Sequence, residues 1–346
     1  MKGNYKTLFL IFVLLFIFLI SNNCKRINKY EADSTVIDNI DIPTEDPFPL
    51  LKGPYLGQKT PGTSPEMFAP GIVSQFVNEL NSCFSPDGNE FYYSKRRGNV
   101  EMDIYVMKRI NEVWEKPQIL SFITEQYNEC DPFISRDGQK LFFSSDRPKE
   151  EGAEPADWNI WMAERQGDEW TEPKILNFNT GKNEAYPTLA KNGNLYFFAG
   201  NYKNSGSFDW DSVDIYCAEF INNQYSTPKK LNDSINSNYN EFDPFIAPDE
   251  SYIIFTRYIP DDGNYGDLYI SFRGKNGKWM NAVNMGPQIN SDRIESNALL
   301  SPDGKYLFFT SFRRTATERP EINKYLNGLG NIYWIDSKII EQNNTL

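Results

Sequence analysis

Residues 78–94 read NELNSCFSPDGNEFYYS, and this stretch decides the fold because it returns four more times along the chain. The later copies are NECDPFISRDGQKLFFSSDR (128–147), NEAYPTLAKNGNLYFFAG (183–200), NEFDPFIAPDESYIIFTR (240–257) and IESNALLSPDGKYLFFTSFR (294–313). Their glutamates recur about every 50 residues, at Glu79, Glu129, Glu184, Glu241 and Glu295. A repeat of this length predicts one supersecondary unit per copy.

Each copy contains runs that favour β-strands. The first has an apolar run, a Ser85-Pro86-Asp87-Gly88 turn and an aromatic run, followed by DIYVM (103–107) and WEKPQIL (114–120). Proline sets φ at the second turn position and glycine tolerates the conformation needed to leave the turn. The aromatic runs are too short for helices. Four short strands per unit predict an all-β fold, a β-propeller of four-stranded blades.

These units resemble the WD40-like (PD40) repeats of the TolB-type propeller superfamily, which combine an SPDG turn with a DIY run. The resemblance covers about residues 68–340. The sequence predicts a propeller over 68–342, with repeats starting near 79, 128, 183, 240 and 294. We expect five blades. A six-bladed ring is the alternative, because TolB-type relatives commonly have six blades and residues 51–69 could form a degenerate one.

The last repeat has NIYWID (331–336) but no clear fourth run. Residues 70–76, PGIVSQF, resemble the fourth-strand sequence PQILSF (117–122). We therefore expect residues 70–76 to supply the outer strand of the last blade, next to the strand near Ile332–Ile335. This pairing would close the ring and remove an exposed sheet edge.

The amino terminus has the pattern of an export signal. Residues 1–24 contain two lysines, an apolar run from Leu8 to Ile20, and then Cys24. The run is short for a membrane span and fits a signal peptide, and the cysteine predicts acylation as in a bacterial lipoprotein. The alternatives are an uncleaved anchor, or ordinary secretion with Cys24 incidental. Residues 25–67 are expected to form a flexible tether and N-terminal extension. We expect an exported protein, a periplasmic or outer-membrane lipoprotein.

Composition narrows the chemistry. The chain has 346 residues, a net charge of −12 and no histidine. The acidic balance argues against nucleic-acid binding, and the missing histidine excludes His-dependent catalysis and His-ligated metals. The remaining cysteines, Cys83, Cys130 and Cys217, show no metal-type spacing and are expected to be buried free thiols. No cofactor is expected.

The starts of the first strands and the loops after the second strands should share one face of the ring. We expect a ligand there, with aromatic platforms on the long loops. The candidates are Trp158, Trp210, Tyr202, Tyr258, Tyr265, Arg96, Arg147, Arg257, Arg313, Glu129, Asp131, Glu184, Glu241, Asp243 and Glu295. The structural alternative is that the repeated Glu and Arg residues pair between neighbouring blades. The aromatics at the fourth strands, Trp114, Trp170, Tyr225 and Trp279, are expected to be packing residues.

Two acidic loop clusters are calcium candidates, although solvated loop charge is the simpler reading. They are Asp209, Asp211 and Asp214, and Asp261, Asp262 and Asp267. The chain has no GxSxG motif, and no carboxylate is marked out as catalytic. The sequence thus predicts a non-catalytic binding or scaffold module of the bacterial cell envelope, anchored to the membrane by its lipid and contacting another envelope protein. The alternatives are a glycan-binding lipoprotein and a carboxylate-dependent glycoside hydrolase or lyase.

Overall fold

The computed structural model describes residues 48–97, 101–149, 157–176, 178, 181–201, 213–260, 266–314 and 319–343. The chain divides into two compact units, residues 1–49 and residues 50–346, and the second contains every strand described below. Within the described ranges, no helix is long and apolar enough to cross a membrane.

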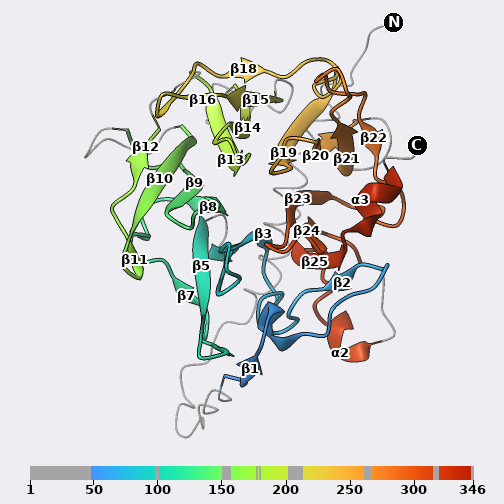
Figure 1. Cartoon of the computed structure of the whole chain (residues 1–346). Coiled ribbons are helices and arrows are strands. Elements are labelled where there is room, and N and C mark those ends of the chain that lie inside the picture. The colour runs from blue at the N-terminus through green and yellow to red at the C-terminus, as the bar shows by residue number, and fades with distance from the viewer. Residues whose placement is uncertain are drawn as a thin grey trace, which may run out of the picture. The chain divides into compact units, whose positions relative to one another are not determined.

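Five antiparallel sheets of the second unit form the blades (Figure 1). The four main strands of blades 1 to 4 follow one another in sequence, whereas blade 5 takes its outer strand from the beginning of the unit. Blade 1 contains β3 (Glu79–Phe84), β4 (Glu90–Arg97), β5 (Glu101–Ile110) and β7 (Gln118–Ile119). Blade 2 contains β8 (Glu129–Ile134), β9 (Lys140–Ser145), β10 (Asn159–Gln166) and β12 (Lys174–Ile175). Blade 3 contains β13 (Asn183–Leu189), β14 (Leu195–Gly200), β15 (Asp214–Ala218) and β18 (Lys229–Lys230).

Blade 4 contains β19 (Asn240–Ile246), β20 (Tyr252–Tyr258), β21 (Asp267–Phe272) and β22 (Val283–Asn284). Blade 5 contains β23 (Glu295–Leu300), β24 (Tyr306–Ser311), β25 (Asn331–Asp336) and β2 (Glu66–Met67). The remaining elements are β1 (Leu51–Lys52), β6 (Val113–Trp114), β11 (Glu169–Trp170), β16 (Phe220–Ile221), β17 (Gln224–Tyr225), η1 (Tyr55–Gly57), α2 (Pro320–Asn323) and α3 (Lys338–Asn343). The first strands of the five blades contact one another in a closed cycle around the centre of Figure 1. The five-bladed β-propeller is confirmed.

Ring closure occurs as expected, but the closing strand differs from the prediction. β2 supplies the outer strand of blade 5, with Met67 opposite Tyr333 and Glu66 opposite Trp334. The prediction that residues 70–76 form this strand is wrong. Ser74 of this segment contacts the Ile332 backbone through its hydroxyl, which donates to the carbonyl and accepts from the N–H. The equivalent of the proline in the Pro-x-x-Leu run is therefore Pro65, not Pro70. Pro65 directly precedes the two-residue strand β2, as Pro117 precedes β7 and Pro173 precedes β12.

Each first strand contains a β-bulge two residues after its glutamate, at Asn81, Asp131, Tyr186, Asp243 and Asn297, and all five have positive φ between 42° and 58°. A bulge turns the backbone N–H of the extra residue away from its own ladder. The Asp131 N–H donates to Ser94 Oγ of the preceding blade at 3.0 Å, and the Tyr186 N–H donates to Ser144 Oγ at 3.0 Å. The bulges therefore link neighbouring blades around the axis.

The blade interfaces are packed by aromatic residues. The fourth-strand aromatics are confirmed as packing residues: Trp114 and Trp170 are buried, and Tyr225 and Trp279 pack against hydrophobic clusters. The Arg165 guanidinium lies 4.2 Å from the centre of the Trp170 ring. The cysteines Cys83, Cys130 and Cys217 are free, and Cys83 is buried while the other two are partly buried.

Candidate functional site

The strand-start face, where the first strands begin, carries the repeated glutamates and arginines. Glu129, Glu241 and Glu295 are fully buried there. Arg147 contacts Glu129 at 2.7 Å, Arg257 contacts Glu241 at 2.7 Å, and Arg313 contacts Glu295 at 3.4 Å. The repeated glutamates and arginines therefore do pair. The prediction that they pair between neighbouring blades is wrong, because each pair lies within one blade.

These ion pairs also hold the chain that leads into each blade. The Ser237 hydroxyl donates to Glu241 at 2.5 Å and the Ser291 hydroxyl donates to Glu295 at 2.7 Å. Burial raises the pKa of Glu241 and Glu295, while the serine and arginine hydrogen bonds oppose the rise. A buried carboxylate that is already bound on several sides has little capacity left for a ligand.

Blade 1 departs from this pattern. No arginine pairs with Glu79; its carboxylate accepts the Gln75 N–H at 3.1 Å, and its Oε1 is buried with no partner among the described residues. Burial raises the pKa of Glu79 to about 8. Arg96 is partly buried, and burial lowers its pKa. Glu184 in blade 3 is buried at its strand start.

The expected aromatic platforms do not come together in the described part of the chain. Trp158 and Tyr258 are both partly buried, on blades 2 and 4. Tyr202, Trp210, Tyr265 and the lipidation candidate Cys24 lie outside the described residues. Of the calcium candidates, Asp214 pairs with Lys230 at 2.8 Å and Asp267 accepts from Asn284 at 2.7 Å; the others also lie outside.

Asp131 and Asp243 are placed differently from the glutamates. They occupy bulge positions, and they lie near enough for the charge of Asp131 to raise the pKa of Asp243. Burial is the main cause of the raised pKa at both residues. Asp243 accepts a hydrogen bond from the Asn297 amide at 3.0 Å, and Asp131 accepts one from the Ser144 hydroxyl at 2.8 Å.

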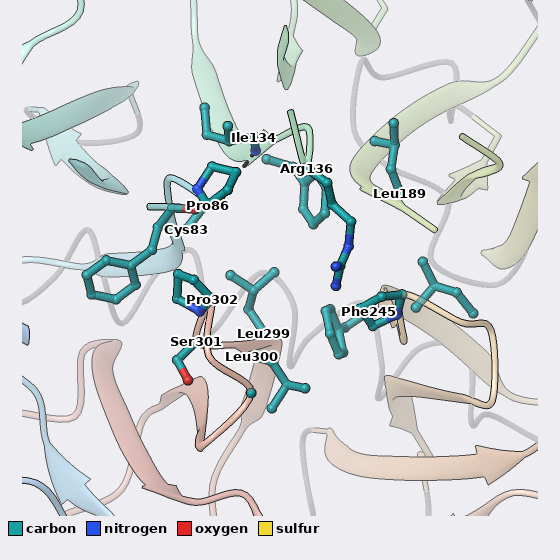
Figure 2. A pocket seen from close by; sticks show the side chains of 15 residues that line it. Cys83, Pro86, Ile134, Arg136, Leu189, Phe245, Leu299, Leu300, Ser301 and Pro302 are labelled. Atoms are coloured by element: carbon teal, nitrogen blue, oxygen red, sulfur yellow. Dashed lines mark hydrogen bonds between the residues drawn. The ribbon is translucent and has the colours of Figure 1, made fainter. Parts of the chain in front are cut away.

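The turn face, opposite the strand-start face, carries a pocket that the sequence did not predict. It encloses about 230 Å³ at the mouth of the central channel, where the first strands end (Figure 2). Phe133, Leu189, Phe245 and Leu300 contribute to its apolar walls. Figure 2 shows Arg136 extending across the pocket toward Phe245.

Arg136 is the chemically distinctive residue of this turn-face pocket. It occupies the turn position that is Pro86 in blade 1, Pro248 in blade 4 and Pro302 in blade 5. It is exposed, and no hydrogen bond or ion pair joins it to another described residue. Arginine in place of the proline of other copies was the feature of the sequence that could have pointed to this site.

A second pocket, of about 440 Å³, adjoins the first and shares Phe84, Pro86 and Pro302 with it. Its outer wall is the segment that contains Tyr55, whose hydroxyl donates to Asp303 at 2.8 Å. The N-terminal segment therefore forms part of the turn face and is more than a connection to the ring.

No protein-family model matches the chain, and no curated protein matches it. Among solved structures, it is similar to an endo-arabinase from Bacteroides thetaiotaomicron VPI-5482, with a TM-score of 0.50 and 11% identity over 78% of this chain and 97% of that one. It is also similar to TolB from Acinetobacter baumannii, with a TM-score of 0.44 and 14% identity over 75% of this chain. The match spans about half of that TolB, 54%. TolB from Agrobacterium tumefaciens matches with a TM-score of 0.42 and 16% identity, over 70% of this chain and 73% of that one.

The endo-arabinase match corrects the expectation that the chain is not an enzyme. That expectation depended on the missing histidine and the missing GxSxG motif. The same propeller architecture occurs in an enzyme and covers nearly all of it, so a single ring of blades does not argue against catalysis. At this identity the likeness concerns the fold alone.

Proposed function

We propose that this chain is an exported β-propeller that binds a protein partner at the turn-face pocket. The observation that carries the proposal is Arg136 over an apolar cavity at the channel mouth, where it makes no hydrogen bond or ion pair with a described residue. Its charge helps to lower the pKa of Asp249, but the two side chains do not form an ion pair. Concave sites with apolar walls and a few polar groups are the usual form of a binding site.

The pocket walls indicate the chemistry of the ligand. Among the described residues, no tryptophan or tyrosine lines this cavity, whereas glycan sites commonly stack sugars on such rings. Aliphatic residues and phenylalanines suit an apolar side chain, and Arg136 supplies five donors for a carboxylate. The best-fitting ligand is a segment of a protein that carries an apolar side chain next to an acidic residue or a free carboxyl terminus.

A peptide array tests this ligand class. The probes are peptides that place Leu, Ile or Phe beside Asp, Glu or a free carboxyl terminus, with a glycan array run in parallel. We expect peptide binding that Arg136→Glu abolishes and that Arg293→Ala, on the strand-start face, leaves unchanged. Binding to glycans alone, or peptide binding that is equal in the Arg136→Glu variant, would overturn the proposal.

The export and anchoring parts of the proposal are supported by residues 1–24 of the sequence. PD40 membership, and acylation at Cys24 that holds the ring at a membrane of the cell envelope, belong to the same proposal. In cell fractionation, Cys24→Ser should move the protein from the membrane to the soluble fraction. Unchanged membrane association of that variant would contradict the lipid anchor.

Catalysis is tested on the same protein. Glycoside hydrolases use two carboxylates that flank the scissile bond. Asp131 and Asp243 lie at the bulges of two first strands, and burial and the charge of Asp131 raise the pKa of Asp243. Incubation with arabinan and xylan oligosaccharides, followed by analysis for released sugars, measures whether the protein cleaves them. Product formation that is lost in both Asp131→Asn and Asp243→Asn would replace the binding proposal with a hydrolase.

A further inference from the structure

The five bulge residues form a polar layer across the central channel, which we call the axial ring: Asn81, Asp131, Tyr186, Asp243 and Asn297. The Tyr186 hydroxyl of blade 3 donates to the Ala298 carbonyl of blade 5 at 3.1 Å, so this side chain reaches beyond the neighbouring blade. Along each first strand, the bulge residue follows the glutamate by two positions and precedes the residues that line the pocket. The axial ring therefore lies between the ion pairs of the strand-start face and the turn-face pocket.

The charges of the axial ring are not balanced by the protein. Asp243 is 9% exposed and Asp131 is partly buried, and neither takes part in an ion pair with a described residue. The nearby arginines are already committed: Arg147, Arg257 and Arg313 pair with the glutamates of their own blades. Two carboxyl groups removed from water must either hold a proton or meet a counter-charge.

Asn81 supplies a second observation that points to a missing partner. Its side chain is only 4% exposed, and its amide hydrogen-bonds the Asp131 carboxylate. The Oδ1 atom of the same amide is buried and has no hydrogen-bond partner in the described part of the chain. Buried amide oxygens are seldom left unpaired. An oxygen acceptor without a donor, beside two carboxylates without a cation, is a donor set that suits a hard metal ion.

We propose that the axial ring binds one hard cation of the calcium class, held by Asp131 and Asp243, with Asn81 Oδ1 as a further ligand. In the described residues, no three His, Cys, Asp or Glu side chains converge on one point, so two carboxylates carry the charge and neutral oxygens and water complete the shell. The cation would neutralise the centre of the ring and join blade 1 to blades 2 and 4.

Metal titration of the full-length protein tests this inference. After treatment with a chelator, CaCl₂, MgCl₂ and NaCl are added separately and followed by calorimetry and thermal unfolding. We expect calcium to raise the Tm of the wild-type protein, and the calcium affinity to fall at least tenfold in Asp243→Asn and Asp131→Asn. The control Asp303→Asn, which removes a turn carboxylate, should bind as the wild type does.

Asn81→Asp provides a gain-of-function variant that does not depend on loss of folding. It adds a third carboxylate to the ring, so calcium should bind at least tenfold more tightly than to the wild type. The absence of any metal-dependent heat or Tm change in the wild type, or an equal change in Asp243→Asn, would overturn the inference. Neither result bears on the peptide binding assigned to Arg136, which is measured separately.

Discussion

Glu79 gives a sharp test of how the strand-start face is stabilised. It is fully buried, no arginine of the described ranges pairs with it, and burial raises its pKa from 4.5 to about 8. Between pH 4.5 and about pH 8, this carboxyl group binds more protons in the folded state than in the unfolded state. The wild-type protein should therefore lose stability as the pH rises from about 4.5 to about 8, and Glu79→Gln should not incur this loss.

The structure sets the size of the effect. Each pKa unit corresponds to about 1.4 kcal/mol, so the interval from 4.5 to about 8 gives an upper limit of about 5 kcal/mol. Hydration and relaxation of the ionised group reduce this penalty, and we expect about 1–3 kcal/mol. Glu79→Gln should thus gain that amount of unfolding free energy relative to the wild type between pH 5 and pH 9.

Urea unfolding followed by tryptophan fluorescence at pH 5 and pH 9 measures this difference. The control is Glu112→Gln, whose parent side chain is 74% exposed and should change stability equally at both pH values. If Glu79→Gln and the wild type lose the same free energy between the two pH values, then burial does not hold the Glu79 proton and the reasoning fails.

Two further substitutions test the contacts that join blades. Phe68 is fully buried, and its ring centre lies 5.2 Å from that of Phe91 in blade 1 and 5.1 Å from that of Phe308 in blade 5, so Phe68→Ala should cost about 3–5 kcal/mol in urea unfolding. The matched Phe76→Ala, at a side chain that is 59% exposed, should cost less than about 1 kcal/mol. Arg165 donates to both Glu90 carboxylate oxygens, at 3.0 and 2.5 Å; Arg165→Ala should cost about 2–4 kcal/mol, and equal stability would show that this link between blades 1 and 2 is dispensable.

The repeat predicted the composition of the strand-start face. The phase of the glutamates correctly placed Glu129, Glu241 and Glu295 on one face with Arg147, Arg257 and Arg313. Their pairing within a blade could not be read from the sequence, since it depends on how far an arginine after the second strand can reach back. The turn-face pocket was missed because its walls come from all five blades, and residues up to about 220 positions apart become neighbours only in the closed ring.

The sequence by itself determined the blade, its four strands and the number of copies, because turns, strand propensity and a repeat of about 50 residues are local properties. Only the tertiary structure decided which proline begins the closing strand, since Pro65 and Pro70 offer similar local patterns and the choice depends on register against β25. It also decided the roles of Asp131 and Asp243. Both sit at the same repeat position as Asn81, and only closure of the ring buries them together, with no Lys or Arg of the described segments in an ion pair with either.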